Sequence, residues 1–133
     1  MTPGDIKQIG ALESPSVSDQ SILLGNRFLS RRGSCLFAGR TGIGKSSATM
    51  QMALHFSVGR ECFGIRPNCD RPLTSLIIQA ENDDGDLSEM RDGILAAAPW
   101  EDCEREGAAL DIEFKTFPTG DNGETATLWG STL

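Results

Sequence analysis

The sequence predicts an α/β fold in which a parallel sheet is flanked by helices. Short apolar runs alternate along the chain with segments of helical periodicity, and a glycine-rich segment joins the first long run to the first helix. Because parallel strands are joined by crossover helices, this alternation favours the order strand, helix, strand, helix, strand in one sheet. We expect an incomplete sheet of about three strands.

The individual elements follow from apolar patterning and stop signals. Continuous apolar runs at residues 34–38 and 73–80 predict strands buried on both faces, and alternation at residues 111–117 predicts a third strand. Helical spacing predicts helices at residues 45–58, before Gly59, and at residues 87–98, before Pro99. Asp86 or Ser88 is the expected N-cap of the second helix. A basic turn is expected at residues 30–33 and a loop at residues 60–72.

Less regular segments flank these elements. Residues 1–20 are rich in Ser, Pro, Gly and acidic residues, a composition typical of a flexible arm. Residues 21–118 hold the predicted domain. Residues 119–133 are polar and predict an irregular, truncated tail.

The glycine-rich segment matches the phosphate-binding P-loop pattern G-x-x-x-x-G-K-[ST] between Gly39 and Ser46. Its glycines let successive backbone N–H groups point at phosphate oxygens, and the following helix adds its positive N-terminal end. Lys45 is expected at the β- and γ-phosphates and Ser46 at magnesium. The pattern predicts binding of ATP, or a similar nucleoside triphosphate, with Mg²⁺. The expected nucleotide-binding residues are Gly39, Arg40, Thr41, Gly42, Ile43, Gly44, Lys45, Ser46 and Ser47.

Hydrolysis also needs a group that orients the attacking water. Glu81 follows the second predicted strand, and ligands of open α/β sheets lie at the carboxyl ends of strands. Spacing alone leaves a solvated carboxylate at the start of a loop equally open. Asp83 and Asp84 are close by but belong to the expected turn.

Two stretches, residues 25–60 and 75–94, resemble the AAA-family ATPases of the RecA-like superfamily, and among them the RepA-like replicative helicases of plasmids and phages. The resemblance covers about residues 21–98, the N-terminal part of such a domain. It implies that Glu81, in the pair Ala80-Glu81, activates the attacking water. Lys45 is then the second catalytic residue. It also implies a hydrolase that works as a ring of six subunits, with DNA as a partner in replication or recombination of a mobile element.

Part of the family pattern is missing. The resemblance also implies a later apolar strand, the Walker B strand, which ends in an Asp that holds magnesium. Residues 76–79 lack the acid, and residues 108–111 have an acid but make a poor buried strand. We expect this strand, the arginine finger and the DNA-binding loops downstream, so that the chain is a fragment or a truncated reading frame.

Three functions therefore remain open. The first is an ATPase that is active in its full-length form. The second is a truncated, non-catalytic nucleotide-binding fragment. The third is a P-loop kinase or other phosphotransferase. Such an enzyme would need an arginine-rich lid, and the sequence shows no such segment.

Composition limits the other possibilities. The 133 residues carry a net charge of -7, which argues against a nucleic-acid surface in this segment. The one basic concentration comprises Arg27, Arg31, Arg32 and Arg40. The first three could touch the nucleotide or a neighbouring subunit, but the pattern favours a solvated turn. The four cysteines match no zinc or CxxC spacing, although Cys62 and Cys69 share a loop and leave a metal or disulfide open. His55 is expected on a helix surface. Without an apolar leader or a membrane-length apolar run, we expect a cytoplasmic protein.

Overall fold

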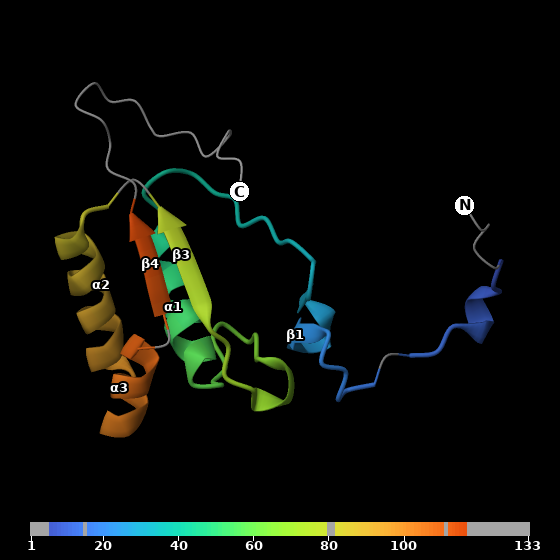
Figure 1. Cartoon of the computed structure of the whole chain (residues 1–133). Helices are drawn as coiled ribbons and strands as arrows, with labels where there is room; N and C mark the ends of the chain where they lie inside the picture. The colour runs from blue at the N-terminus through green and yellow to red at the C-terminus, as the bar shows by residue number, and fades with distance from the viewer. Residues whose placement is uncertain (1–5, 15, 80–81, 111, 117–133) are drawn as a thin grey trace.

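The computed structural model describes residues 6–14, 16–79, 82–110 and 112–116. Its central unit is a two-stranded parallel sheet with three helices (Figure 1). Strand β3 (Ser75–Gln79) pairs with β4 (Ile112–Thr116), from Ser75 opposite Ile112 to Gln79 opposite Thr116. The predicted parallel α/β organisation is thus present, with two parallel strands in the described part of the chain.

Helix α1 (Lys45–Ser57) supplies the centre of the core. Its apolar residues Met50 and Leu54 are almost fully buried and meet residues that follow α2 or lie in α3: Ala98, Trp100 and Ala108. The prediction of this helix and of its stop at Gly59 is confirmed. Trp100 also lies edge-on to His55, with ring centroids 4.8 Å apart.

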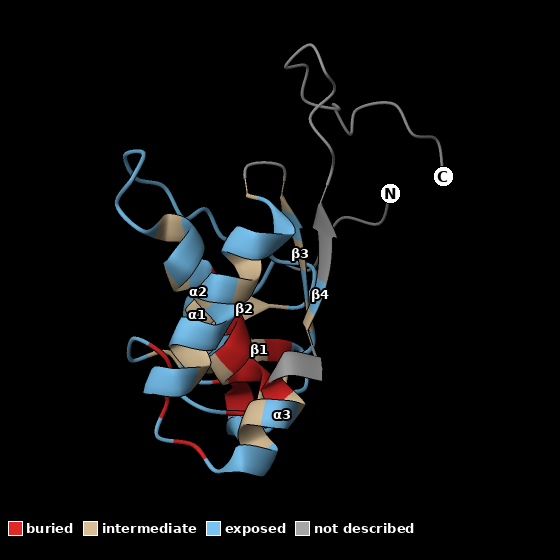
Figure 2. Cartoon of the chain, turned by 90° about the vertical axis from the view of Figure 1, so that its left-hand side faces the viewer, coloured by how far each residue is buried: buried red, intermediate tan, exposed pale blue. Residues whose placement is uncertain are grey.

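The helices cover one face of the sheet (Figure 2). Ile77 and Ile112 pack against the core, whereas Leu76 and Ile78, which alternate with Ile77 along the strand, are 59% and 51% exposed. The second predicted strand therefore exists, but its expected burial on both faces is wrong. Alternation of burial along β3 shows that the strand has a packed face and an open face.

Helix α2 (Asp84–Ala97) begins one turn earlier than predicted. The Asp86 N–H donates to Asp83 Oδ1 at 2.8 Å, so Asp83 is the N-cap and the expected caps are wrong. Acidic side chains in the first turn also suit the positive end of the helix dipole. The stop before Pro99 is confirmed, since Ala98 is the C-cap.

Helix α3 (Asp102–Leu110) was not predicted. The Glu101 N–H donates to Glu104 Oε2 at 3.1 Å, which is the reciprocal half of a capping box. Glu104 also accepts three hydrogen bonds from the Arg60 guanidinium, at 2.9, 3.0 and 3.1 Å, and so ties α3 to the segment after α1. Residues 108–110, a candidate Walker B strand, belong to this helix, so that interpretation is wrong; Asp111 lies outside the described residues.

The expected strand at residues 34–38 is also wrong. These residues form no strand and are exposed, with Leu36 89% exposed. A strand buried on both faces needs neighbours that pair with its backbone and layers that cover it. Within the described residues, none of the four strands pairs with this run.

A small antiparallel pair, β1 (Ile22–Leu24) and β2 (Leu29–Ser30), precedes this run. The expected basic turn follows it, closed by the Gly33 N–H donating to the Ser30 oxygen at 2.9 Å. The pair packs against the loop at residues 60–72, where the Gly25 N–H donates to the Arg66 oxygen at 2.7 Å. The division into arm, domain and tail stays a prediction, and residues 117–133 of the predicted tail lie outside the described residues.

None of the helices in the described part of the chain combines the length and the apolar character needed to cross a bilayer.

Candidate functional site

The loop before α1 has the backbone conformation that a phosphate cradle requires. Gly42 and Gly44 have φ values of +83° and +88°, a region that residues with side chains rarely adopt. Gly44 precedes α1, and no side chain caps the helix there. The first N–H groups of α1 therefore face the loop, where an anion can bind them. A Cβ at Gly39 would lie 2.5 Å from Ile43 Cδ1, the end of an exposed side chain that can rotate away.

Lys45 closes the loop on itself. Its ammonium donates to the carbonyl oxygens of Gly39, at 2.8 Å, and Arg40, at 2.7 Å. Because an ammonium has three donors, one remains for a further acceptor. The Lys45 carbonyl in turn accepts the Thr49 hydroxyl at 2.9 Å. The cation that the motif predicts for the phosphates is thus held over the loop by backbone oxygens.

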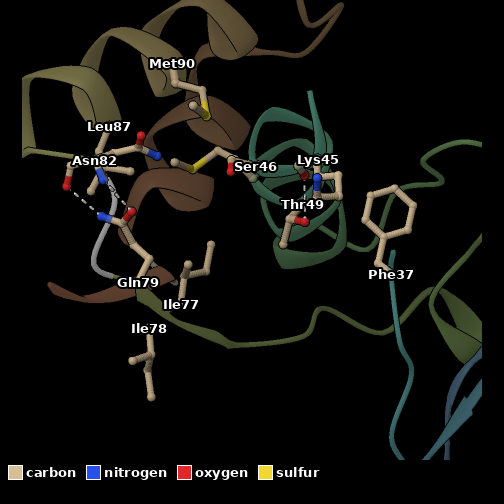
Figure 3. Close-up of a pocket in the computed structure, with 11 residues that line it drawn as sticks. Phe37, Lys45, Ser46, Thr49, Ile77, Ile78, Gln79, Asn82, Leu87 and Met90 are labelled. Carbon is tan, nitrogen blue, oxygen red and sulfur yellow. Dashed lines mark hydrogen bonds between the residues drawn. The ribbon is translucent and has the colours of Figure 1, made fainter. Parts of the chain in front are cut away.

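A pocket of about 230 Å³ opens beside this loop, between the start of α1, the end of β3 and the start of α2 (Figure 3). Its wall is largely apolar, and Lys45 is the only charged residue among its described lining residues. A mainly apolar pocket with a few convergent polar groups is the usual form of a small-molecule site. The lining consists of Phe37, Lys45, Ser46, Thr49, Met50, Ile77, Ile78, Gln79, Asn82, Leu87 and Met90.

The structure brings together some of the predicted site residues. Lys45 and Ser46 line this pocket, whereas Ser47 lines a separate hollow between α1 and α2. The remaining loop positions are exposed and do not line the pocket: Gly39, Arg40, Thr41, Gly42, Ile43 and Gly44. Glu81, the predicted water-activating carboxylate, lies outside the described residues, as does Ala80.

Gln79 and Asn82 were missed by sequence reasoning. Gln79 Nε2 donates to the Asn82 oxygen at 2.9 Å, and the Asn82 N–H donates to Gln79 Oε1 at 3.0 Å. This pair of hydrogen bonds fixes the backbone of Asn82 against the last residue of β3 (Figure 3). The available signal was an amide residue at the end of a strand, three positions before another amide.

The arginines of the basic turn do not line this pocket. Arg31 Nε instead donates to the Gln20 oxygen at 3.1 Å, and Arg27 and Arg32 are exposed. The solvated-turn interpretation therefore describes their environment best.

The residues present fit a magnesium nucleotide. The described part of the chain holds no group of three His, Cys, Asp or Glu side chains that could bind a metal ion by itself. Ser46 supplies one hydroxyl oxygen at the pocket, and the P-loop mode of binding takes further magnesium ligands from the nucleotide phosphates. The site thus suits a metal that arrives with its nucleotide.

Comparison with known proteins places the chain in a family. Neither a curated protein nor a solved structure matches the chain. A family model described as an AAA domain matches residues 8–113, well over half of the chain. The match spans the P-loop, strand β3, the first two residues of β4 and all three helices. The chain therefore belongs to the AAA domain family, whose members are of the P-loop NTPase type.

Proposed function

We propose that this domain binds ATP with Mg²⁺ at the pocket beside the P-loop and hydrolyses it. The observation that carries the proposal is the position of Lys45 over a loop whose glycines have left-handed φ values, at the uncapped start of α1. Mg²⁺, when bound with the nucleotide, neutralises charge on the phosphate oxygens. Lys45 binds the β- and γ-phosphates, Ser46 holds the metal ion, and the loop N–H groups orient the phosphate chain.

The catalytic part of the proposal rests on Glu81. Glu81 follows β3 and Ala80 directly in the sequence. This Ala-Glu pair after a strand resembles the pair that contains the water-activating glutamate of RecA-like ATPases, and this resemblance supports a catalytic role. The same resemblance supports a RepA-like role in DNA replication or recombination of a mobile element, within a ring of subunits. These finer functions are proposals that follow from sequence resemblance.

Binding is tested with a fluorescent ATP analogue in the presence of Mg²⁺. A hydrogen bond to a charged group contributes about 1.5–3 kcal/mol, so Lys45→Ala should weaken binding by about 10- to 100-fold. Lys7→Ala is the matched control, because Lys7 is exposed and far from the loop in sequence. Equal affinities of the Lys45→Ala and Lys7→Ala variants would overturn the proposed site.

Turnover separates the catalytic proposal from a binding-only module. Residues 108–110, one of the two stretches that could have imitated a Walker B strand, are helical, which favours binding without hydrolysis as the second candidate function. ATP hydrolysis that is lost in Glu81→Gln, with binding retained, supports the ATPase. Binding by the parent chain without any hydrolysis supports the binding module, and hydrolysis that survives Glu81→Gln unchanged refutes the role of Glu81.

A further inference from the structure

The polar side chains of the P-loop pocket differ in whether they already have hydrogen-bond partners. The Lys45 ammonium donates to two backbone oxygens, the Thr49 hydroxyl donates to the Lys45 oxygen, and the Gln79 amide is engaged with the Asn82 backbone. Among the residues that the structure describes, the side chains of Ser46 and Asn82 make no hydrogen bond. Together with the remaining donor of Lys45, these two side chains are therefore the polar groups of the pocket left to meet a ligand.

Asn82 is held in place on both sides. The two hydrogen bonds from Gln79 fix its backbone N–H and oxygen to the end of β3, at 3.0 and 2.9 Å. The next residue, Asp83, is fixed by capping α2. Asn82 is itself half-buried at the pocket wall. Its side chain thus projects from a backbone that is anchored to the sheet and adjoins an anchored helix start.

The position of Asn82 points to one end of the nucleotide. It shares the pocket with Lys45 and Ser46, on the side formed by the end of β3 (Figure 3). In the P-loop mode of binding, the lysine would contact the β- and γ-phosphates, and the hydroxyl residue would hold the metal ion that arrives with the nucleotide. A group that faces these two residues across the pocket therefore faces the terminal phosphate rather than the base or the ribose.

We propose that Asn82 is a ligand-contacting residue that distinguishes nucleoside triphosphate from diphosphate, and that Gln79 is the positioning residue that holds it. The proposal rests on the proposed nucleotide binding. The Asn82 side-chain NH₂ donates to an oxygen of the γ-phosphate, and this donor has no partner when a diphosphate is bound. A neutral amide suits this role because a carboxylate at the same place would repel the phosphate.

The test compares dissociation constants for ADP and for a non-hydrolysable ATP analogue, both with Mg²⁺. Asn82→Asp keeps the shape but replaces the donor by a negative charge. We expect it to weaken binding of the analogue by about 10-fold or more and binding of ADP by less than about 2-fold. Asn26→Asp is the matched control, since it changes the same group in the exposed turn between β1 and β2. Circular dichroism verifies that each variant keeps its helices.

The positioning role of Gln79 needs its own variants. Gln79→Leu removes both hydrogen bonds and should lower analogue affinity selectively, while hydrogen exchange at the Asn82 amide becomes faster. Gln79→Glu keeps the acceptor and regains a donor on protonation, so its analogue affinity relative to the parent should recover as the pH falls toward about 4–5. Gln51→Glu on α1 is the control for the added charge.

Failure of nucleotide binding and failure of the Asn82 contact give different results in these measurements. A parent chain that binds neither nucleotide would overturn the proposed function, and this inference with it. A parent chain that binds both nucleotides, while Asn82→Asp leaves the ratio of their affinities unchanged, would overturn the role of Asn82 alone. Loss of triphosphate preference in Asn82→Asp but not in Gln79→Leu would overturn the positioning role.

Discussion

Replacing Gly59 by alanine tests how α1 ends and how the following loop packs against it. The Arg60 N–H donates to the His55 oxygen at 2.9 Å, and the Gly59 N–H donates to the Phe56 oxygen at 3.1 Å. These are the two hydrogen bonds of a Schellman motif, in which Gly59 takes the left-handed position with a φ of +73°.

The substitution Gly59→Ala should destabilise the folded state in two ways. A side chain in the left-handed region costs about 1–2 kcal/mol. The new Cβ would also overlap the Asp70 carbonyl oxygen, a backbone atom that cannot rotate away. Such overpacking costs about 1–3 kcal/mol more. We therefore expect the free energy of unfolding to fall by about 2–5 kcal/mol.

Two further glycines separate these costs. Gly64 has a φ of +75°, but a Cβ added there would meet no atom within 4 Å, so Gly64→Ala should show only the backbone cost of about 1–2 kcal/mol. Gly93 lies inside α2 with open space around it, and Gly93→Ala should stabilise by about 1 kcal/mol. Urea unfolding followed by circular dichroism measures all three. A Gly59→Ala variant no less stable than Gly64→Ala would refute the packing of the Asp70 segment against the end of α1.

Three other predictions probe the same fold. Burial raises the pKa of Cys62 to about 11, so a thiol reagent at neutral pH should label the three exposed cysteines of the native protein, and Cys62 only after denaturation. Hydrogen bonds, chiefly from Arg60 and then from the Glu101 N–H, lower the pKa of Glu104. The ionised Glu104 carboxylate therefore stabilises the fold above the unfolded pKa of about 4.3, and this stabilisation is lost as the pH falls through the lower folded pKa. The melting temperatures of the parent and of Glu104→Gln should therefore converge in acid. Asp83→Ala should destabilise by about 1 kcal/mol through loss of the α2 cap, and Asp84→Ala by clearly less in the same urea assay.

Local signals were sufficient for some elements. Helix α1 and strand β4 were predicted because their apolar residues recur at helical spacing and in alternation, and strand β3 was predicted from a continuous apolar run. Helix α3 was missed although its sequence is amphipathic, because it is only nine residues long and Gly107, a poor helix former, interrupts it. The start of α2 was misplaced because several acidic residues in succession could each cap a helix, and only the bond from Asp86 to Asp83 selects one.

Other features depend on contacts that no local pattern encodes. An apolar run such as residues 34–38 forms a strand only where a neighbouring strand pairs with it, and none in the described residues does. At the site, the P-loop was readable because phosphate binding demands glycines and a lysine at fixed spacing. The roles of Gln79 and Asn82 could not be predicted in this way. Hydrogen bonds from a single side chain to the backbone three residues away leave no repeated pattern in the sequence.

The central claim is that this P-loop binds a magnesium nucleotide through Lys45. The most direct measurement is the unfolding free energy of the parent chain and of Lys45→Ala, each with and without ATP and Mg²⁺. A ligand that binds only the folded state stabilises it by about 2.7 kcal/mol at 100 times the dissociation constant. We predict such an increase for the parent at saturating nucleotide and a much smaller one for Lys45→Ala. No increase in the parent, or equal increases in both proteins, would contradict the claim.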